Sequence, residues 1–208
     1  MNDLIAAALA EMNICLPGVI IAYDGTTATV QSALPKQLAN GEILAAPQIV
    51  RVPVCWPIAD GGRALVTVPL KPGDPVKLNF SQRSLENWLS GSDQAPDDPR
   101  QFDLTDCFAS PVMRPGMSAD PDNVTVQYGA GTLKIAPSGD MTITAPSLTI
   151  NAPTTVNGLL TYTEGMIGSG GEHTASITGD VIANGVSLVG HTHNGVQPGS
   201  GNSGGPNT

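Results

Sequence analysis

Residues 124–150 read VTVQYGAGTLKIAPSGDMTITAPSLTI. An apolar–polar–apolar triplet recurs in this stretch at steps of about seven to nine residues. The triplets are Val124-Thr125-Val126, Leu133-Lys134-Ile135, Met141-Thr142-Ile143 and Leu148-Thr149-Ile150. Alternate side chains of a strand point to opposite faces, so each triplet puts two apolar side chains on one face. Gly, Pro, Ser, Asn or Asp residues fill the gaps, which predicts very short strands joined by turns.

The pattern continues more loosely to residue 188, and one chain with such thin strands cannot enclose a core. Three chains winding together can do so, with their apolar residues turned toward a common axis. We therefore predict an intertwined, trimeric, triple-stranded β-helix over residues 118–189. A single-chain parallel β-helix is the alternative, although its coils are usually longer and its apolar ladders larger. Disorder is a weaker alternative because the apolar alternation is regular.

The stretch that follows, residues 190–199, reads GHTHNGVQPG. If it is extended, the imidazoles of His191 and His193 leave the same face. Two nitrogen ligands are too few to hold a metal well, but three chains on one axis would offer about six, enough for one octahedral ion. Zinc prefers four ligands, whereas iron, nickel and copper all suit imidazole. The alternative is a pair of solvated loop histidines in a tail rich in Gly, Asn and Ser.

The N-terminal part of the chain has a different pattern of apolar residues. Residues 2–14 have the apolar spacing of one short helix, which Pro17-Gly18 would end. Short apolar runs separated by turn residues then follow. The expected strands are Val19–Tyr23, Thr27–Ala33, Ile49–Ile58, Ala64–Leu70, Val76–Phe80 and a closing strand Phe108–Met113. This density of short strands predicts a small OB-like barrel, and residues 1–117 are the expected first domain.

Composition excludes several classes of function. The net charge of −9 disfavours binding to nucleic acid, and only 13% of residues are charged and 4% aromatic. A barrel that binds oligonucleotides needs basic and aromatic residues on one face, so a docking role fits this one better. We expect no signal peptide and no membrane span, because the N-terminus lacks a basic region and no apolar run approaches about 18 residues.

Other reactive residues carry weaker signals. Cys15, Cys55 and Cys107 form no metal-binding spacing and are predicted to be buried free thiols of a protein folded in a reducing cytosol. The acidic residues between positions 93 and 106 match no EF-hand loop and are predicted to lie in a solvated loop. No separated pair of carboxylates with a cleft and no Ser/His/Asp arrangement is evident, so we expect no enzyme.

Two parts of the chain resemble a known family. Residues 177–193, ITGDVIANGVSLVGHTH, and the Gly- and Ser-rich residues 194–206 resemble the C-terminal end of central spike proteins of contractile-tailed bacteriophages. These are the baseplate assembly protein V type, also called membrane-piercing needles. RSLENWL at residues 83–89 and RQFDLTD at residues 100–106 resemble the N-terminal OB-fold domain of the same family.

The resemblance implies a homotrimer at the tail baseplate tip of the virion, made in the host cytoplasm. Its OB domains would meet the tail hub, and its β-helix would narrow to a point that pierces the host outer membrane without enzymatic activity. An iron ion would be shared by six histidines, His191 and His193 of each chain, in a tip formed by residues 190–208. Many relatives have Gly at Asn194 and Thr-Gly-x-Pro at residues 203–206, but neither departure removes a ligand.

Two further expectations accompany the resemblance. His173 lies outside the motif and is expected at the surface of the shaft. The alternative function is a receptor-binding, lectin-like tail fibre, or the spike of a related contractile injection particle. The tip offers Gly, Ser and Asn rather than the aromatic platforms that recognition would need, which favours penetration.

Overall fold

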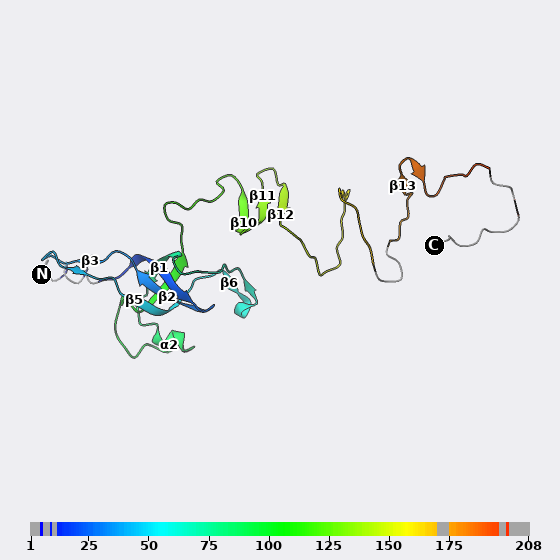
Figure 1. Ribbon diagram of the computed structural model, residues 1–208. Coiled ribbons are helices and arrows are strands. Elements are labelled where there is room, and N and C mark those ends of the chain that lie inside the picture. The colour runs from blue at the N-terminus through cyan, green and yellow to red at the C-terminus, as the bar shows by residue number, and fades with distance from the viewer. Residues whose placement is uncertain (1–4, 6–8, 10–11, 170–174, 196–198, 200–208) are drawn as a thin grey trace. The chain divides into compact units, whose positions relative to one another are not determined.

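The computed structural model describes residues 5, 9, 12–169, 175–195 and 199 (Figure 1). The chain forms two units, Met1–Pro146 and Ser147–Thr208. Most regular structure in the described residues is β, which confirms the predicted mainly β class. The predicted helix over residues 2–14 falls largely outside the described residues. Ile5 and Leu9 are helical, but residues 12–14 are not.

A five-stranded antiparallel sheet, in the order β5-β2-β1-β8-β9, forms the first part of the chain. Its strands are β1 (Cys15–Tyr23), β2 (Thr27–Ser32), β5 (Gln48–Pro53), β8 (Pro75–Phe80) and β9 (Cys107–Pro111). The sheet curls until its edges meet just beyond β5. Val54 forms a parallel bridge with Ala109 of β9, and the Cys55 amide donates to the Ala109 carbonyl oxygen at 2.8 Å.

The core lies inside this curled sheet. Its buried members are Ile20, Ala28, Val30, Ile49, Val52, Leu70, Val76, Leu78, Cys107 and Ala109. The alternation of side chains along each strand places them there. In β2, for example, Ala28, Val30 and Ser32 are buried, and the residues between them are only half-buried. Gly18 permits the closest approach of neighbouring strands, because a Cβ there would lie 2.6 Å from Val30 Cγ1.

The predicted turns agree with the structure better than the predicted strand ends. The Asp24-Gly25 turn joins β1 to β2, and Asp24 Oδ1 accepts the amides of Thr26 and Thr27 at 2.8 and 2.7 Å. These hydrogen bonds hold the pKa of Asp24 below its ordinary value, with the Thr27 amide contributing most. However, β1 begins at Cys15, so Pro17-Gly18 lies inside a strand. The prediction that these two residues end a helix is therefore wrong.

Two predicted strands are interrupted. The strand expected over residues 49–58 ends at Pro53, and the strand expected over residues 64–70 is only Ala64–Leu65 (β7). Prolines at 53, 57 and 69 lack the N–H that a continuing ladder needs. β7 pairs with β6 (Ile58–Ala59) across the 3-10 turn η1 (Asp60–Gly62). A second small hairpin, β3 (Lys36–Gln37) with β4 (Ile43–Leu44), has no counterpart in the predictions.

The connection from β8 to β9 is anchored rather than simply solvated. It contains the short helix α2 (Glu86–Leu89), and its last residue, Asp106, is buried. Asp106 Oδ1 accepts the Leu85 amide at 2.8 Å, and the Arg100 guanidinium binds both carboxylate oxygens, with Nε 2.6 Å from Oδ2. Arg100 also pairs with Asp98 at 2.7 Å. The predicted solvated loop is therefore wrong for Asp106.

The first three triplets form a separate antiparallel sheet of β10 (Val124–Tyr128), β11 (Gly131–Ile135) and β12 (Met141–Thr144). The register places Val124, Ile135 and Met141 side by side, followed by Val126, Leu133 and Ile143. One face is therefore entirely apolar, and Thr, Gln and Lys side chains form the other. Strands from this stretch pair within one chain, whereas the prediction had them winding around other chains.

The second unit contains little regular structure in its described part. Only the hairpin of β13 (Ile182–Ala183) and β14 (Val186–Ser187) forms strands there, and Leu148-Thr149-Ile150 does not. No described residue after Ala109 is buried, and the Ile167 side chain is 99% exposed. The described residues of this region therefore form no core within a single chain.

Candidate functional site

The predicted metal ligands directly follow the β13–β14 hairpin. Asn184 and Gly185 form its turn with φ of 49° and 80°, the left-handed conformation that a tight hairpin requires. The Leu188 amide then donates to the Val181 carbonyl oxygen at 2.8 Å, which extends the pairing beyond the strands. The hairpin thus fixes the chain up to the residues just before His191.

His191 is held through one ring nitrogen. Its Nδ1 lies 2.8 Å from the Ser187 carbonyl oxygen. A carbonyl oxygen only accepts hydrogen bonds, so Nδ1 must carry the proton, and Nε2 of the neutral ring keeps a free lone pair. This is the usual arrangement of a metal-binding histidine, whose second nitrogen donates to a carbonyl or carboxylate.

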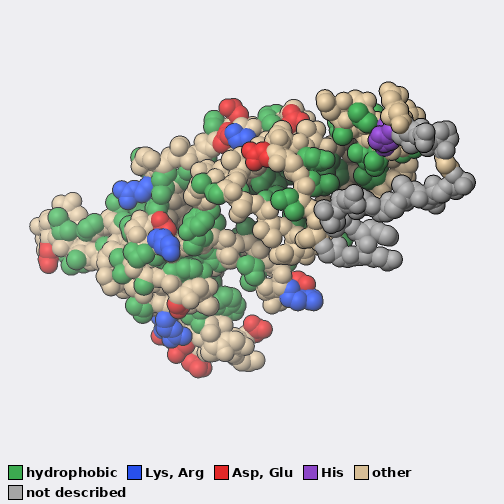
Figure 2. Space-filling model, turned by 45° about the vertical axis from the view of Figure 1, so that its right-hand side comes forward, with side chains coloured by type: hydrophobic (Ala, Val, Ile, Leu, Met, Phe, Trp, Pro, Cys, Tyr) green, Lys and Arg blue, Asp and Glu red, His purple; other side chains and the backbone are tan. Residues whose placement is uncertain are grey.

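His191 and His193 lie side by side. Their ring centroids are 5.0 Å apart with an interplanar angle of 81°, and both residues are exposed. The histidines described by the structure form one small surface patch (Figure 2). The rings of the two predicted ligands therefore lie next to each other within one chain. Val196–Pro198 of the motif and His173 lie outside the described residues.

The donor set fits an imidazole-bound transition metal, but one chain supplies only part of it. Within the described part of the chain, no three His, Cys, Asp or Glu side chains gather into a group that could hold an ion. Two neutral imidazole nitrogens are suitable but insufficient ligands for iron, nickel or copper. A complete site would need His191 and His193 of further chains.

The acidic residues between positions 93 and 106, all of them described, gather into no group that could hold a calcium ion. Asp98 and Asp106 are paired with Arg100, and Asp103 accepts the Thr105 amide and hydroxyl at 2.8 and 2.6 Å. The Thr105 hydrogen bonds hold the pKa of Asp103 below its ordinary value. These carboxylates therefore order their own loop.

The cysteines are free, as predicted, but only Cys107 is buried. Burial raises the pKa of its thiol to about 12, so it remains protonated and unreactive. Cys15 and Cys55 are exposed, which corrects the prediction of three buried thiols. Both lie where strand pairing is incomplete: Cys15 is the first residue of β1, and Cys55 lies beyond the end of β5.

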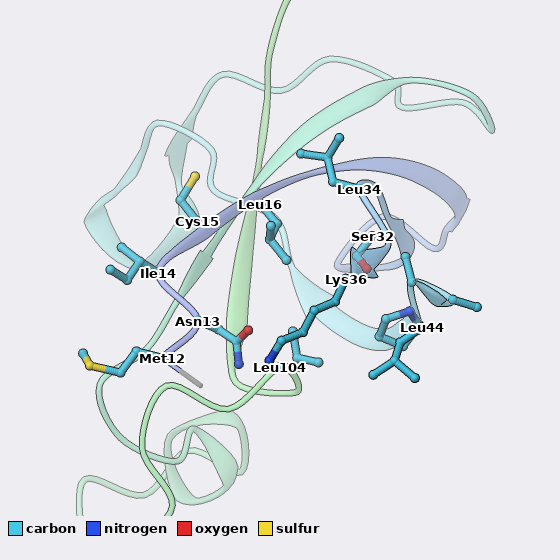
Figure 3. Close-up of a pocket in the computed structure, with 13 residues that line it drawn as sticks. Met12, Asn13, Ile14, Cys15, Leu16, Ser32, Leu34, Lys36, Leu44 and Leu104 are labelled. Atoms are coloured by element: carbon cyan, nitrogen blue, oxygen red, sulfur yellow. The ribbon is translucent and has the colours of Figure 1, made fainter. Parts of the chain in front are cut away.

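An apolar groove of about 620 Å³ opens beside β1 of the curled sheet (Figure 3). Leu16, Leu34, Leu44 and Leu104 contribute much of its lining, and Ser32 and Lys36 add polar atoms. The groove also borders Met12, where the continuously described part of the chain begins.

Comparison with protein-family models gives two matches. Residues 16–112, which contain the curled sheet, match the Phage protein Gp138 N-terminal domain. Residues 185–207, which contain both tip histidines, match the GpV Apex motif. The chain is related to phage tail central spikes.

This relationship confirms the resemblance drawn from the sequence and supports a role as a tail spike, located in the virion tail. Structural spike families of this kind are typically non-enzymatic. No curated protein matches the chain in a sequence comparison. Among the described residues, no helix has the length and apolar character needed to cross a membrane.

Proposed function

We propose that the chain is the central spike of a contractile phage tail, a homotrimer that pierces the host outer membrane when the sheath contracts. The sheath supplies the work. The spike needs a stiff shaft, a tip that does not fray and a base that docks on the tail hub. Two observations on the described residues carry this proposal: the apolar surface after residue 109 is left uncovered, and the tip histidines do not complete a metal site within one chain.

The β10–β12 sheet supports the trimer. Its apolar face presents six side chains, Val124, Val126, Leu133, Ile135, Met141 and Ile143, in two cross-strand rows of three. Exposed apolar patches of this kind mark interaction surfaces. Three copies around a threefold axis would turn these faces inward and leave Thr125, Lys134 and Thr142 in water. For residues 147–189, which follow this sheet, we retain the predicted intertwined β-helix, because it would cover their exposed apolar side chains.

The first unit supports a docking base. The order β5-β2-β1-β8-β9, with the two edges meeting at Val54 and Ala109, is the arrangement expected of a five-stranded OB-type barrel. The chain is acidic and poor in aromatic residues, so attachment to the tail hub suits this barrel better than binding nucleic acid. Tails assembled with a shaft-deleted chain should then still contain the barrel at the baseplate.

The tip histidines support a metal clamp at the apex. His191 and His193 of three chains would supply an all-imidazole octahedral set, which iron accepts and zinc does not favour. When bound, the metal would cross-link three chain ends that would otherwise fray. Cellular supply and the related spikes favour iron over nickel or copper.

Elemental analysis of the purified protein, combined with its mass in solution, tests this proposal. We expect a trimer with about one iron ion per three chains. The His191→Ala/His193→Ala variant should remain trimeric, lose the metal and become protease-sensitive from about residue 190. His173→Ala is the matched control and should keep the metal. A wild-type trimer without a transition metal, or a double variant with unchanged metal content, would eliminate the clamp.

A further inference from the structure

The hairpin that precedes the tip contains a hydrogen-bond network that the spacing of residues does not predict. The Ser187 hydroxyl donates to the Asp180 carboxylate and accepts the Gly190 amide at 2.6 Å. Asp180 Oδ1 also accepts the Val189 amide at 3.1 Å. The Ser187 hydroxyl thus uses its donor and one acceptor position, and its backbone carbonyl oxygen receives His191 Nδ1.

This network controls the segment from which His191 projects. Asp180 holds the amide two residues before His191, and Ser187 holds the amide directly before it. The turn is tight, because a Cβ at Gly190 would lie only 3.1 Å from Ser187 Oγ. The position of the Ser187 carbonyl, and with it the His191 ring, therefore depends on side chains that do not touch the ring.

We propose that Asp180 and Ser187 are positioning residues that hold His191 with Nδ1 protonated and Nε2 presented outward. The proposal rests on the tip metal site proposed above, since an outward Nε2 is the nitrogen a metal would take. Partners that orient a ligand in this way typically change metal affinity by about 10- to 100-fold when they are removed. Neither residue is expected to bind the metal itself.

The competing explanation is that Asp180 and Ser187 only stabilise a hairpin. The chain contains a suitable comparison in the turn between β11 and β12. There Ser138 Oγ donates to Asp140 Oδ2 at 2.7 Å across Gly139, whose φ is 89°, and the sequence contains no histidine nearby. Ser138→Ala therefore removes a similar Ser–Asp hydrogen bond from a turn that holds no proposed ligand.

The first measurement uses the full-length, metal-free protein with ¹⁵N-labelled histidine, and it reads which ring nitrogen carries the proton. In the wild type, we expect the His191 proton on Nδ1. Asp180→Ala and Ser187→Ala should shift the proton toward Nε2, the position that free histidine favours. Asp180→Asn keeps an acceptor oxygen and should preserve the wild-type pattern, as should Ser138→Ala. A wild-type His191 protonated on Nε2, or an unchanged pattern in both alanine variants, would overturn the proposal.

The second measurement titrates the same proteins with ferrous iron against a competing chelator. Asp180→Ala and Ser187→Ala should bind iron about 10- to 100-fold more weakly. Asp180→Asn and Ser138→Ala should stay within about twofold of the wild type. Equal losses in Ser138→Ala and Ser187→Ala would reduce the effect to general stability and overturn the positioning role. Absence of iron binding in the wild type would refute the metal clamp, and the tautomer measurement would then decide the positioning role independently.

Discussion

The five-stranded sheet and the β10–β12 sheet use the same alternation of apolar and polar residues with opposite results. In the first, alternate residues such as Ile20 and Val30 are fully buried because the sheet curls around them. In the second, Val126 and Ile143 remain 67% and 55% exposed, because three strands and one chain supply no second layer. Alternation therefore predicts strands and a face to be covered, but the number of strands available decides whether the chain can cover that face itself.

The largest effect is expected from cutting the chain between these regions. A fragment of residues 1–117 should fold as a monomer, because its core is complete within one chain. A fragment starting near residue 120 should have no folded monomer, since its stability would depend on chain concentration. Sedimentation and circular dichroism at decreasing concentration measure both. A folded monomer of the C-terminal fragment would break the comparison.

Introducing one aspartate on the apolar face or on the polar face of β12 tests whether the apolar face is an interface. Ile143→Asp should dissociate the proposed trimer, because burying a carboxylate without a partner costs on the order of several kcal/mol. Thr142→Asp changes the neighbouring residue on the polar face, where Lys134 lies opposite, and should alter stability by no more than about 0.5 kcal/mol. Light scattering of the two variants distinguishes the faces. Equal behaviour would mean that the apolar face is not an interface.

In the first unit, the analogous contrast is between a buried and an exposed ion pair. Arg100→Ala should destabilise the curled sheet by about 3–5 kcal/mol, because it leaves the buried Asp106 carboxylate without its charged partner. Arg63→Ala breaks a pair whose side chains are 80% and 58% exposed and should cost no more than about 1 kcal/mol. Trp56 and Trp88 both belong to the first unit, so tryptophan fluorescence during denaturation reports on it specifically. Similar losses in the two variants would contradict the anchoring role of Asp106.

Local signals predicted the parts of the fold that local chemistry determines. Asp24-Gly25 gave the β1–β2 hairpin, and three of the triplets gave β10–β12. The prolines at 53 and 57 carried the signal for the interrupted strands, but the alternation around them outweighed it. The burial of Asp106 depends on Arg100 and Leu85, and no spacing in the sequence indicates that they converge.

At the tip, spacing predicts His191 and His193 as ligands, but it does not predict the hydrogen bonds of Asp180 and Ser187 to the amides that precede His191. A signal did exist. Asn184-Gly185 between apolar residues is a strong hairpin signal, and a hairpin there brings Asp180 to Val189 across the two strands. A complete metal site would also need two further chains on a common axis. The contacts within one chain do not test this, so the trimeric site remains a prediction.

The smallest expected effect concerns the start of the β10–β12 sheet at low pH. Asp120 lies 2.9 Å from Lys134 Nζ and accepts hydrogen bonds from the Asn123 side chain and the Asp122 amide. These contacts, with Lys134 contributing most, hold the pKa of Asp120 well below its ordinary value of 3.8. A depressed pKa means that the folded state prefers the ionised carboxylate. The stabilising contribution of Asp120 is therefore complete above pH 3.8 and is lost as the pH falls toward the pKa of the folded state.

Carboxyl ¹³C titration should show Asp120 still ionised at pH 3.8, and Lys134→Met should raise the titration midpoint of Asp120. An ordinary wild-type midpoint would mean that Asp120 and Lys134 are not paired in solution, and the sheet would lose this link between its polar face and the segment that precedes it.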